Sequence, residues 1–249
     1  MTRLRKNDAA HREPPRHSMS TNECIALCLS LALTIGSGLA GLSAEVKPSE
    51  TVGGWGSVVD PVGDCTFSHE GGTFTIKVPG EEHNLWPVKG KVNAPLVLQE
   101  VEGDFTVEVL VRSVEKAEKG TAIPGRASTV AFHSGTLVIW QDARNFVRLD
   151  RTDMNNSGRA ITSCYLHVFK DGERVVELAP VVPDRPTNLR LARKDNRLTA
   201  AYSQDRGKTW KAFPEQTIDL PAKVKTGISA LNSTVRINTV QFEGLKVTK

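Results

Sequence analysis

Residues 188–210 read NLRLARKDNRLTAAYSQDRGKTW and decide the fold class. Apolar and polar residues alternate from Asn188 to Ala192 and again from Arg197 to Ser203, which is typical of half-buried strands. Between these runs lie Lys194-Asp195-Asn196, which include residues that tolerate positive φ. The two runs are therefore predicted to pair as a β-hairpin.

Runs of the same kind recur through the chain, each closed by Gly, Pro, Asn or Asp. They cover residues 73–78, 105–112, 136–142, 146–151, 165–170, 174–178, 224–230, 235–242 and 245–248. Asp171-Gly172 stands between two runs and is a strong hairpin signal. No stretch has a convincing helical period, so we predict an all-β chain with sheet packed on sheet. We expect irregular loops at residues 113–126, 153–161 and 180–186.

The first 44 residues have the layout of a secretory signal peptide. Five basic residues precede the apolar run from Cys24 to Ala40, and small residues end at Ser43-Ala44, where we expect cleavage. A membrane anchor is the alternative, but polar and Gly residues interrupt the run, which is short for a span of about 20 apolar residues. Met19 is an alternative start. We predict a signal peptide over residues 1–44, export (secreted or periplasmic), and no stable membrane insertion after cleavage.

The remaining residues, 45–249, are predicted to form a single domain, because about 205 residues suit one β-sandwich. The chain has 32 Lys and Arg and 28 Asp and Glu, a net charge of +4. Residues 1–44 hold five of these basic and three of these acidic residues, which leaves 27 against 25, a net charge of +2. The sequence therefore lacks the clustered positive charge of a nucleic-acid-binding protein.

Two of the four cysteines, Cys24 and Cys28, belong to the predicted leader. In an oxidising compartment the other two, Cys65 and Cys164, are expected to form a disulfide. Two separate buried thiols fit the sequence nearly as well, because sequence does not show whether their Cα atoms lie close enough. No Cys/His spacing typical of zinc is present, so we predict no metal and no other cofactor; calcium binding stays open.

Alternation also assigns side chains to the faces of the sheets. The expected core residues are Phe105, Val107, Val109, Val111, Val147, Leu149, Leu189 and Leu191. If these strands belong to one sheet, its outer face displays Glu108, Arg148, Asp150 and Arg190, with Trp140 or Gln141 nearby. The continuous apolar run from Leu137 to Trp140 does not settle which way the Trp140 indole points.

These six outer-face residues are the predicted ligand surface. Carboxylates, guanidinium groups and an aromatic ring suit a sugar, whose hydroxyls need donors and acceptors and whose ring stacks on Trp. Arg148→Ala is then expected to abolish glycan binding at a stability cost of at most about 0.5 kcal/mol. In the alternative interpretation the charges are cross-strand ion pairs on a solvated face, each contributing about 0.2 to 1 kcal/mol.

Ser203, Asp205, Gly207, Thr209 and Trp210 match the Asp-box pattern of sialidase-like propellers. Asp205 can accept backbone N–H bonds across the turn, Gly207 can take positive φ, and Trp210 can fold beneath the hairpin. A propeller needs several such units and this chain has one. We therefore interpret the box as a structural turn.

The order of several short motifs is more specific than any one of them. The motifs are Gly53-Gly54-Trp55-Gly56, Asp60-Pro61, Gly63-Asp64-Cys65, Val78-Pro79-Gly80, Asn93-Ala94-Pro95, Glu102 to Phe105, Leu137 to Asp142, Asn145 to Asp150 and the box above. From about Gly53 to Lys249 the chain resembles the concanavalin A-like domain family named for regulation-of-enolase protein, whose biochemical activity is unknown. The resemblance implies a jelly-roll sandwich of two antiparallel sheets, related in shape to legume lectins and laminarinase-type glycoside hydrolases. It supplies no catalytic residues.

Three functions remain open, and an exported glycan-binding or glycan-associated module is the one we favour. A sugar-acting hydrolase or lyase would need two carboxylates about 5 to 9.5 Å apart, for which Glu108 and Asp150 are the candidates. The Glu-x-Asp-x-(x)-Glu strand of laminarinase-type enzymes is missing from the sequence, which argues against catalysis. The third function is a structural or protein-interaction domain without a small ligand.

Overall fold

Strands dominate the structure, a computed structural model that describes residues 44–47, 49–125 and 130–249. The predicted leader lies outside the described residues, apart from Ala44. Within the described part of the chain, no helix has the length and apolar character needed to cross a membrane.

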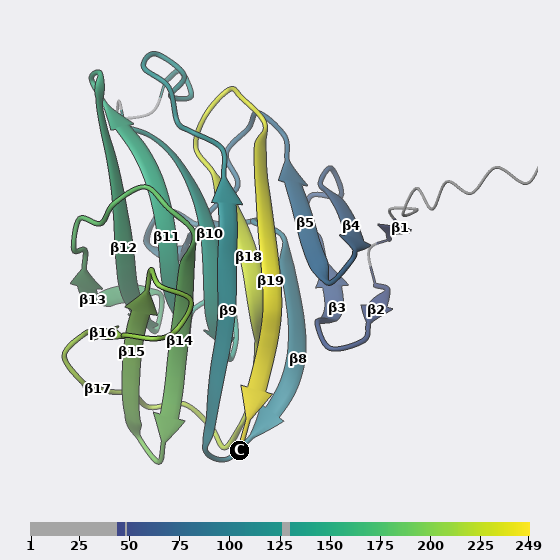
Figure 1. Cartoon of the computed structure of the whole chain (residues 1–249), viewed down its shortest axis with the longest axis vertical. Helices are drawn as coiled ribbons and strands as arrows, with labels where there is room; N and C mark the ends of the chain where they lie inside the picture. The colour runs from purple at the N-terminus through teal and green to yellow at the C-terminus, as the bar shows by residue number, and fades with distance from the viewer. Residues whose placement is uncertain (1–43, 48, 126–129) are drawn as a thin grey trace, which may run out of the picture. The chain divides into compact units, whose positions relative to one another are not determined.

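Nine strands form one antiparallel sheet (Figure 1). In pairing order they are β1 (Ala44–Val46), β4 (Thr66–Glu70), β5 (Thr73–Val78), β19 (Asn238–Thr248), β9 (Phe105–Val114), β14 (Thr187–Lys194), β15 (Arg197–Ser203) and β16 (Lys211–Ala212), with β17 (Gln216–Thr217) also paired to β15.

Eight strands form the second antiparallel sheet. Their order is β13 (Glu173–Leu178), β12 (Arg159–Lys170), β11 (Phe146–Asn156), β10 (Ala131–Trp140), β18 (Lys223–Asn232), β8 (Leu96–Glu102), β3 (Gly56–Val59) and β2 (Thr51–Val52). A small ribbon of β6 (Leu85–Trp86) and β7 (Lys91–Val92) flanks the 3-10 turn η1 (Pro87–Lys89). The fold is therefore an all-β jelly-roll sandwich of two antiparallel sheets, as predicted.

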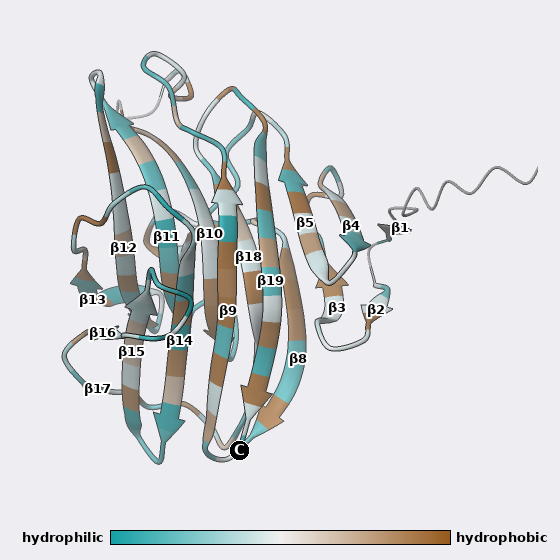
Figure 2. Cartoon of the chain, viewed as in Figure 1, coloured by the Kyte–Doolittle hydropathy of each residue, from teal (hydrophilic) through white to brown (hydrophobic). Residues whose placement is uncertain are grey.

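The main core lies between the two sheets, where β9 and β14 pack against β10 and β11. All eight predicted core residues are buried in this layer. Figure 2 shows hydrophobic and hydrophilic residues alternating along β19, as expected for a strand with one face in the core. The two runs predicted at residues 235–242 and 245–248 are joined in this one strand, which has an irregular register between Glu243 and Lys246.

The turns follow the chemistry of their residues. Asp195 at the β14–β15 turn and Asp171 at the β12–β13 turn both have positive φ, which confirms the two predicted hairpins. The loop predicted at residues 153–161 is wrong. There β11 and β12 continue in register to Asn156 and Arg159, and the reversal needs only Ser157 and Gly158, both with positive φ.

A second apolar cluster lies on the outer face of the eight-stranded sheet. The segment at residues 82–94, which we call the covering segment, contributes Leu85 and Ala94, and both are fully buried. They pack with Phe146, Phe169 and other outer-face residues of the sheet. The covering segment therefore shields part of a face that alternation alone assigns to solvent, and it forms one wall of the site described next.

Candidate functional site

The structure separates the six predicted ligand residues into two groups on different sheets. Glu108 of β9 and Arg190 of β14 belong to the nine-stranded sheet, whereas Trp140, Gln141, Arg148 and Asp150 belong to or adjoin β10 and β11 of the eight-stranded sheet. Both groups point away from the inter-sheet core, so they lie on opposite outer faces of the sandwich. The prediction of one continuous surface is wrong, because the strands do not share a sheet.

Glu108 and Arg190 form a cross-strand ion pair. The Arg190 Nε lies 2.8 Å from the Glu108 carboxylate, and the guanidinium lies 3.6 Å from the centre of the Trp210 ring. Both side chains are about one third exposed. Here the alternative interpretation of the sequence fits, since a half-exposed pair of this kind is worth at most about 1 kcal/mol.

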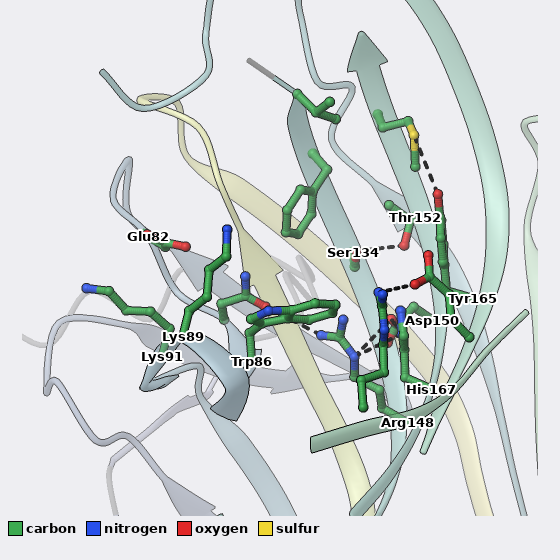
Figure 3. Close-up of a pocket in the computed structure, with 16 residues that line it drawn as sticks. Glu82, Trp86, Lys89, Lys91, Ser134, Arg148, Asp150, Thr152, Tyr165 and His167 are labelled. Atoms are coloured by element: carbon green, nitrogen blue, oxygen red, sulfur yellow. Dashed lines mark hydrogen bonds and ion pairs between the residues drawn. The ribbon is translucent and has the colours of Figure 1, made fainter. Parts of the chain in front are cut away.

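A pocket of about 310 Å³ opens on the outer face of the eight-stranded sheet (Figure 3). Its lining combines residues of β10 to β13 with the covering segment: Glu82, Asn84, Trp86, Lys89, Lys91, Val130, Phe132, Ser134, Arg148, Asp150, Thr152, Met154, Tyr165, His167, Arg174 and Glu177. In Figure 3, Glu82, Lys89 and Lys91 lie on one side of the pocket, and Tyr165 and His167 lie on the other. Of the six predicted ligand residues, only Arg148 and Asp150 line it.

Asp150 is the centre of the polar floor. Its carboxylate accepts a hydrogen bond from the Thr136 hydroxyl at 2.8 Å and lies 3.4 Å from Arg148 Nε and 3.5 Å from His167 Nδ1. Strand pairing sets this geometry, because Thr136 of β10 lies directly opposite Asp150 and His167 of β12 lies opposite Arg148. Arg148 also donates to the Asn84 side chain at 3.5 Å, which ties the floor to the covering segment.

Burial governs the charges of this floor. Arg148 is 4% exposed and Asp150 is 1% exposed, so the expectation that Arg148 is a solvent-exposed side chain is wrong. Burial alone would raise the pKa of Asp150, but the Arg148 charge and the hydrogen bonds from His167 and Thr136 outweigh it and hold the pKa below its usual range. For His167, burial and the neighbouring Arg148 charge lower the pKa, so the ring is neutral at neutral pH.

Aromatic rings form the walls above the floor. The Tyr165 ring stacks on His167 with centroids 5.4 Å apart, and Trp86 meets His167 edge-on at 5.6 Å. The guanidinium groups of Arg148 and Arg174 lie 5.6 Å and 4.8 Å from the centre of the Trp86 ring. These contacts, with the pairing of Trp86 to Lys91 in the β6–β7 ribbon, hold the Trp86 ring in place.

Trp140 and Gln141 do not line this pocket. The direction of the Trp140 indole was unsettled by the sequence; in the structure it stacks on Phe146 at 4.9 Å and packs against the second apolar cluster. Gln141 follows the end of β10, where its backbone N–H donates to the Asn145 carbonyl at 3.1 Å in a tight turn.

The proposed carboxylate pair does not exist as a site. Glu108 and Asp150 lie on opposite outer faces with the whole core between them. Two carboxylates must lie within about 10 Å on one substrate to act in glycoside hydrolysis. The nomination of Glu108 and Asp150 as a catalytic pair is therefore wrong.

The predicted disulfide is also wrong: Cys65 and Cys164 are both buried free thiols. Cys65 immediately precedes β4, whereas Cys164 lies in β12 close enough to Tyr202 of β15 to affect its pKa. In the nine-stranded sheet β4 and β15 are separated by β5, β19, β9 and β14, a distance of roughly 24 Å at about 4.8 Å per strand. The two thiols therefore lie at different ends of the sandwich.

Comparison with known proteins supports the fold. No protein-family model matches the sequence, and no curated protein matches it. Among solved structures, the chain is similar to a functionally unknown protein from Saccharomyces cerevisiae, with 17% identity and a TM-score of 0.61 over 78% of this chain and 96% of that one. It is also similar to a mutant form of the GH43 protein BlXynB from Bacillus licheniformis, with 12% identity and a TM-score of 0.50. That match covers 70% of this chain and 32% of the larger protein.

Sequence reasoning missed most of the pocket. One usable signal was the strand 165–170, where Tyr165, His167 and Phe169 alternate with Leu166 and Val168. This alternation puts Tyr165, His167 and Phe169 on the face opposite the apolar residues, the same face as Arg148 and Asp150. Trp86 and Asn84 gave no such signal, because the covering segment has no periodic pattern.

Proposed function

We propose that this protein is an exported glycan-binding module whose ligand occupies the pocket beside Trp86 and Tyr165. The observation that carries the proposal is a buried, hydrogen-bonding floor directly below aromatic walls. A sugar has apolar ring faces that pack on aromatic rings and hydroxyls that need donors and acceptors, and ligand pockets combine these two kinds of lining.

Several polar groups are placed to meet hydroxyls of a ligand. The Tyr165 hydroxyl contacts the Met154 sulfur at 3.8 Å, a weak acceptor that a sugar oxygen would readily replace. Ser134 and Thr152 share a hydrogen bond of 2.8 Å, in which either oxygen can be the donor, so the pair adapts to the partner it meets. The pocket volume of about 310 Å³ is at the lower end of the range for small-ligand sites, about 300 to 1,000 Å³.

The test is a glycan array on the purified protein, followed by calorimetry with each glycan that binds. Trp86→Ala should weaken binding at least about tenfold, which corresponds to a loss of roughly 1.4 kcal/mol of binding free energy. Trp210→Ala is the matched control, because Trp210 packs on Arg190 at the opposite outer face, and it should leave affinity unchanged. An array without any bound glycan, or equal affinity in wild type and Trp86→Ala, contradicts the proposal.

The proposal includes family and location. The order of motifs supports membership of the concanavalin A-like family named for regulation-of-enolase protein, and the jelly-roll fold is consistent with it. The basic and apolar leader supports export. Mass spectrometry of secreted material should find cleavage near Ala44; retention of residues 24–40 in that material would instead favour a membrane anchor.

One observation favours a second candidate, an enzyme that acts on the same sugar. His167 is neutral, lines the pocket and stacks on Tyr165, so an imidazole that can accept a proton lies beside a phenol that can donate one. Glycans that bind should be incubated with the protein and their products separated by chromatography. Cleavage that is lost in His167→Gln, while binding is kept, would establish this candidate; intact glycans would eliminate it.

A further inference from the structure

Three metal-binding side chains meet outside the pocket, at the start of β4. They are Asp64, Cys65 and His83, and their oxygen, sulfur and nitrogen atoms all lie within 4.8 Å of one another. The Asp64 carboxylate lies 2.9 Å from His83 Nε2 and 3.5 Å from Cys65 Sγ. Sequence spacing did not suggest this cluster, because His83 is 18 residues beyond Cys65 and belongs to the covering segment.

The hydrogen bonds of His83 leave its Nε2 suited to a cation. Its Nδ1 faces the Glu81 carbonyl at 3.3 Å, and its Nε2 faces the Asp64 carboxylate at 2.9 Å. In the tautomer with the proton on Nδ1, the ring donates to the Glu81 carbonyl, and Nε2 is free to bind a metal ion beside the Asp64 oxygen. An outer hydrogen bond from the ring to a backbone carbonyl is typical of histidines that bind metal.

The three ligands are held by rigid structure. The His83 backbone exchanges two hydrogen bonds of 2.9 Å with Asn232 at the end of β18, and the Cys65 N–H donates to the Asp60 carboxylate at 2.9 Å. Cys65 and His83 are buried, whereas the Asp64 side chain is 33% exposed and gives access from solvent. The second carboxylate, Asp60, adds negative charge beside the thiol.

We propose that Asp64, Cys65 and His83 bind one Zn²⁺. Zinc takes sulfur, nitrogen and carboxylate oxygen ligands in tetrahedral sites, and three protein ligands leave one position for water. A thiolate and a carboxylate balance the charge of the ion. Binding displaces the thiol proton to solvent, so it is favoured as pH rises. The three ligands do not line the glycan pocket, although His83 lies between Glu82 and Asn84, which do.

The test uses the full chain, stripped with a chelator and then titrated with Zn²⁺ and with Co²⁺. We expect the wild-type chain to bind one more ion than the Cys65→Ser variant. With Co²⁺ it should also show an absorption band from thiolate-to-cobalt charge transfer. Cys65→Ser and His83→Gln should each abolish this band or weaken metal affinity by more than about 100-fold. Removing an outer-shell partner costs roughly 10- to 100-fold in metal affinity, so a larger loss identifies a direct ligand. Cys164→Ser is the matched control: it removes the other buried thiol and should keep both band and affinity.

The zinc proposal also needs a folding control and has two outcomes that contradict it. Circular dichroism and thermal melting of the metal-free variants establish that they are folded before binding is compared. Equal binding by wild type and Cys65→Ser would overturn the proposal, as would the absence of any bound ion. Either result would leave the His83–Asp64 contact as a structural hydrogen bond.

Discussion

At the scale of the residue, the main feature is the group of buried charges on the outer face of the eight-stranded sheet, which forms the floor of the pocket. A buried charge is tolerated only when it is paired and hydrogen-bonded. Asp150 meets this condition through Arg148, His167 and Thr136. Glu108 and Arg190 are about one third exposed, so water solvates their charges as well. The same strand alternation thus produces a solvated ion pair on one sheet and a pocket floor on the other.

Asp150→Asn should destabilise the protein by about 3 to 5 kcal/mol, because it leaves the Arg148 guanidinium buried without its counter-charge. Urea unfolding followed by fluorescence measures the change in the free energy of unfolding. The double variant Asp150→Asn with Arg148→Met should recover much of the loss, since it removes the unpaired charge. Glu108→Gln is the control on the opposite face, and a cost there as large as at Asp150 would contradict the argument.

The two cysteines carry a prediction of their own. With EDTA and without reductant, thiol labelling in denaturant should modify both Cys65 and Cys164, as peptide mass spectrometry can show. In the folded protein Cys164 should react very slowly, because burial shields it and raises its pKa to about 12, and the thiolate is the reactive form. A mass lower by two hydrogens with neither residue labelled would show a disulfide instead.

At the scale of the element, close approach between strands is set by glycine. A Cβ added to Gly227 of β18 would lie 1.9 Å from the Val97 carbonyl oxygen of β8, a backbone atom that cannot rotate away. Gly227 pairs with Leu98 on one side and Val138 on the other, so β18 cannot shift without disturbing both neighbours. Both of those neighbours also pack beneath the covering segment.

Gly227→Ala should therefore lower the free energy of unfolding by at least about 2 kcal/mol, the scale of overpacking in a tight core. Gly53→Ala is the matched control, because nothing lies within 4 Å of an added Cβ there and its φ is not positive. It should change stability by no more than about 0.5 kcal/mol. Thermal and urea unfolding of the two variants compare them directly; equal stability of both would contradict the packing seen around Gly227.

At the scale of the whole molecule, buried neutral histidines link stability to pH. Burial lowers the pKa of both His133 and His167 in the folded chain. His133 is fixed by the Glu115 carbonyl at 3.0 Å and the Thr234 hydroxyl at 2.8 Å, neither of which requires a charged ring. In the unfolded chain both rings bind a proton near pH 6.5.

Stability should consequently fall as the pH is lowered from 7.5 to 5.5. Between these values the unfolded chain binds more protons than the folded chain, so the free energy of unfolding rises with pH. The contribution is complete above the unfolded pKa and is lost as the pH falls toward the folded pKa. The urea midpoint at the two pH values measures it, and His133→Gln should reduce the difference. A midpoint that rises on acidification would contradict this assignment.

The sequence by itself determined most of the strands after Gly71, the hairpins at Asp171 and Asp195, and the faces of β9, β11 and β14, because local alternation and turn chemistry require no knowledge of distant residues. Val147 and Leu149 face the core and Arg148 and Asp150 face away from it, as the period of two dictates. Only the tertiary structure decided that Glu108 and Arg148 lie on different sheets, since strand order depends on pairings far apart in the chain. It also decided that the covering segment, which carries Trp86, lies over an outward face and turns it into a pocket, because its sequence has no period from which these contacts follow.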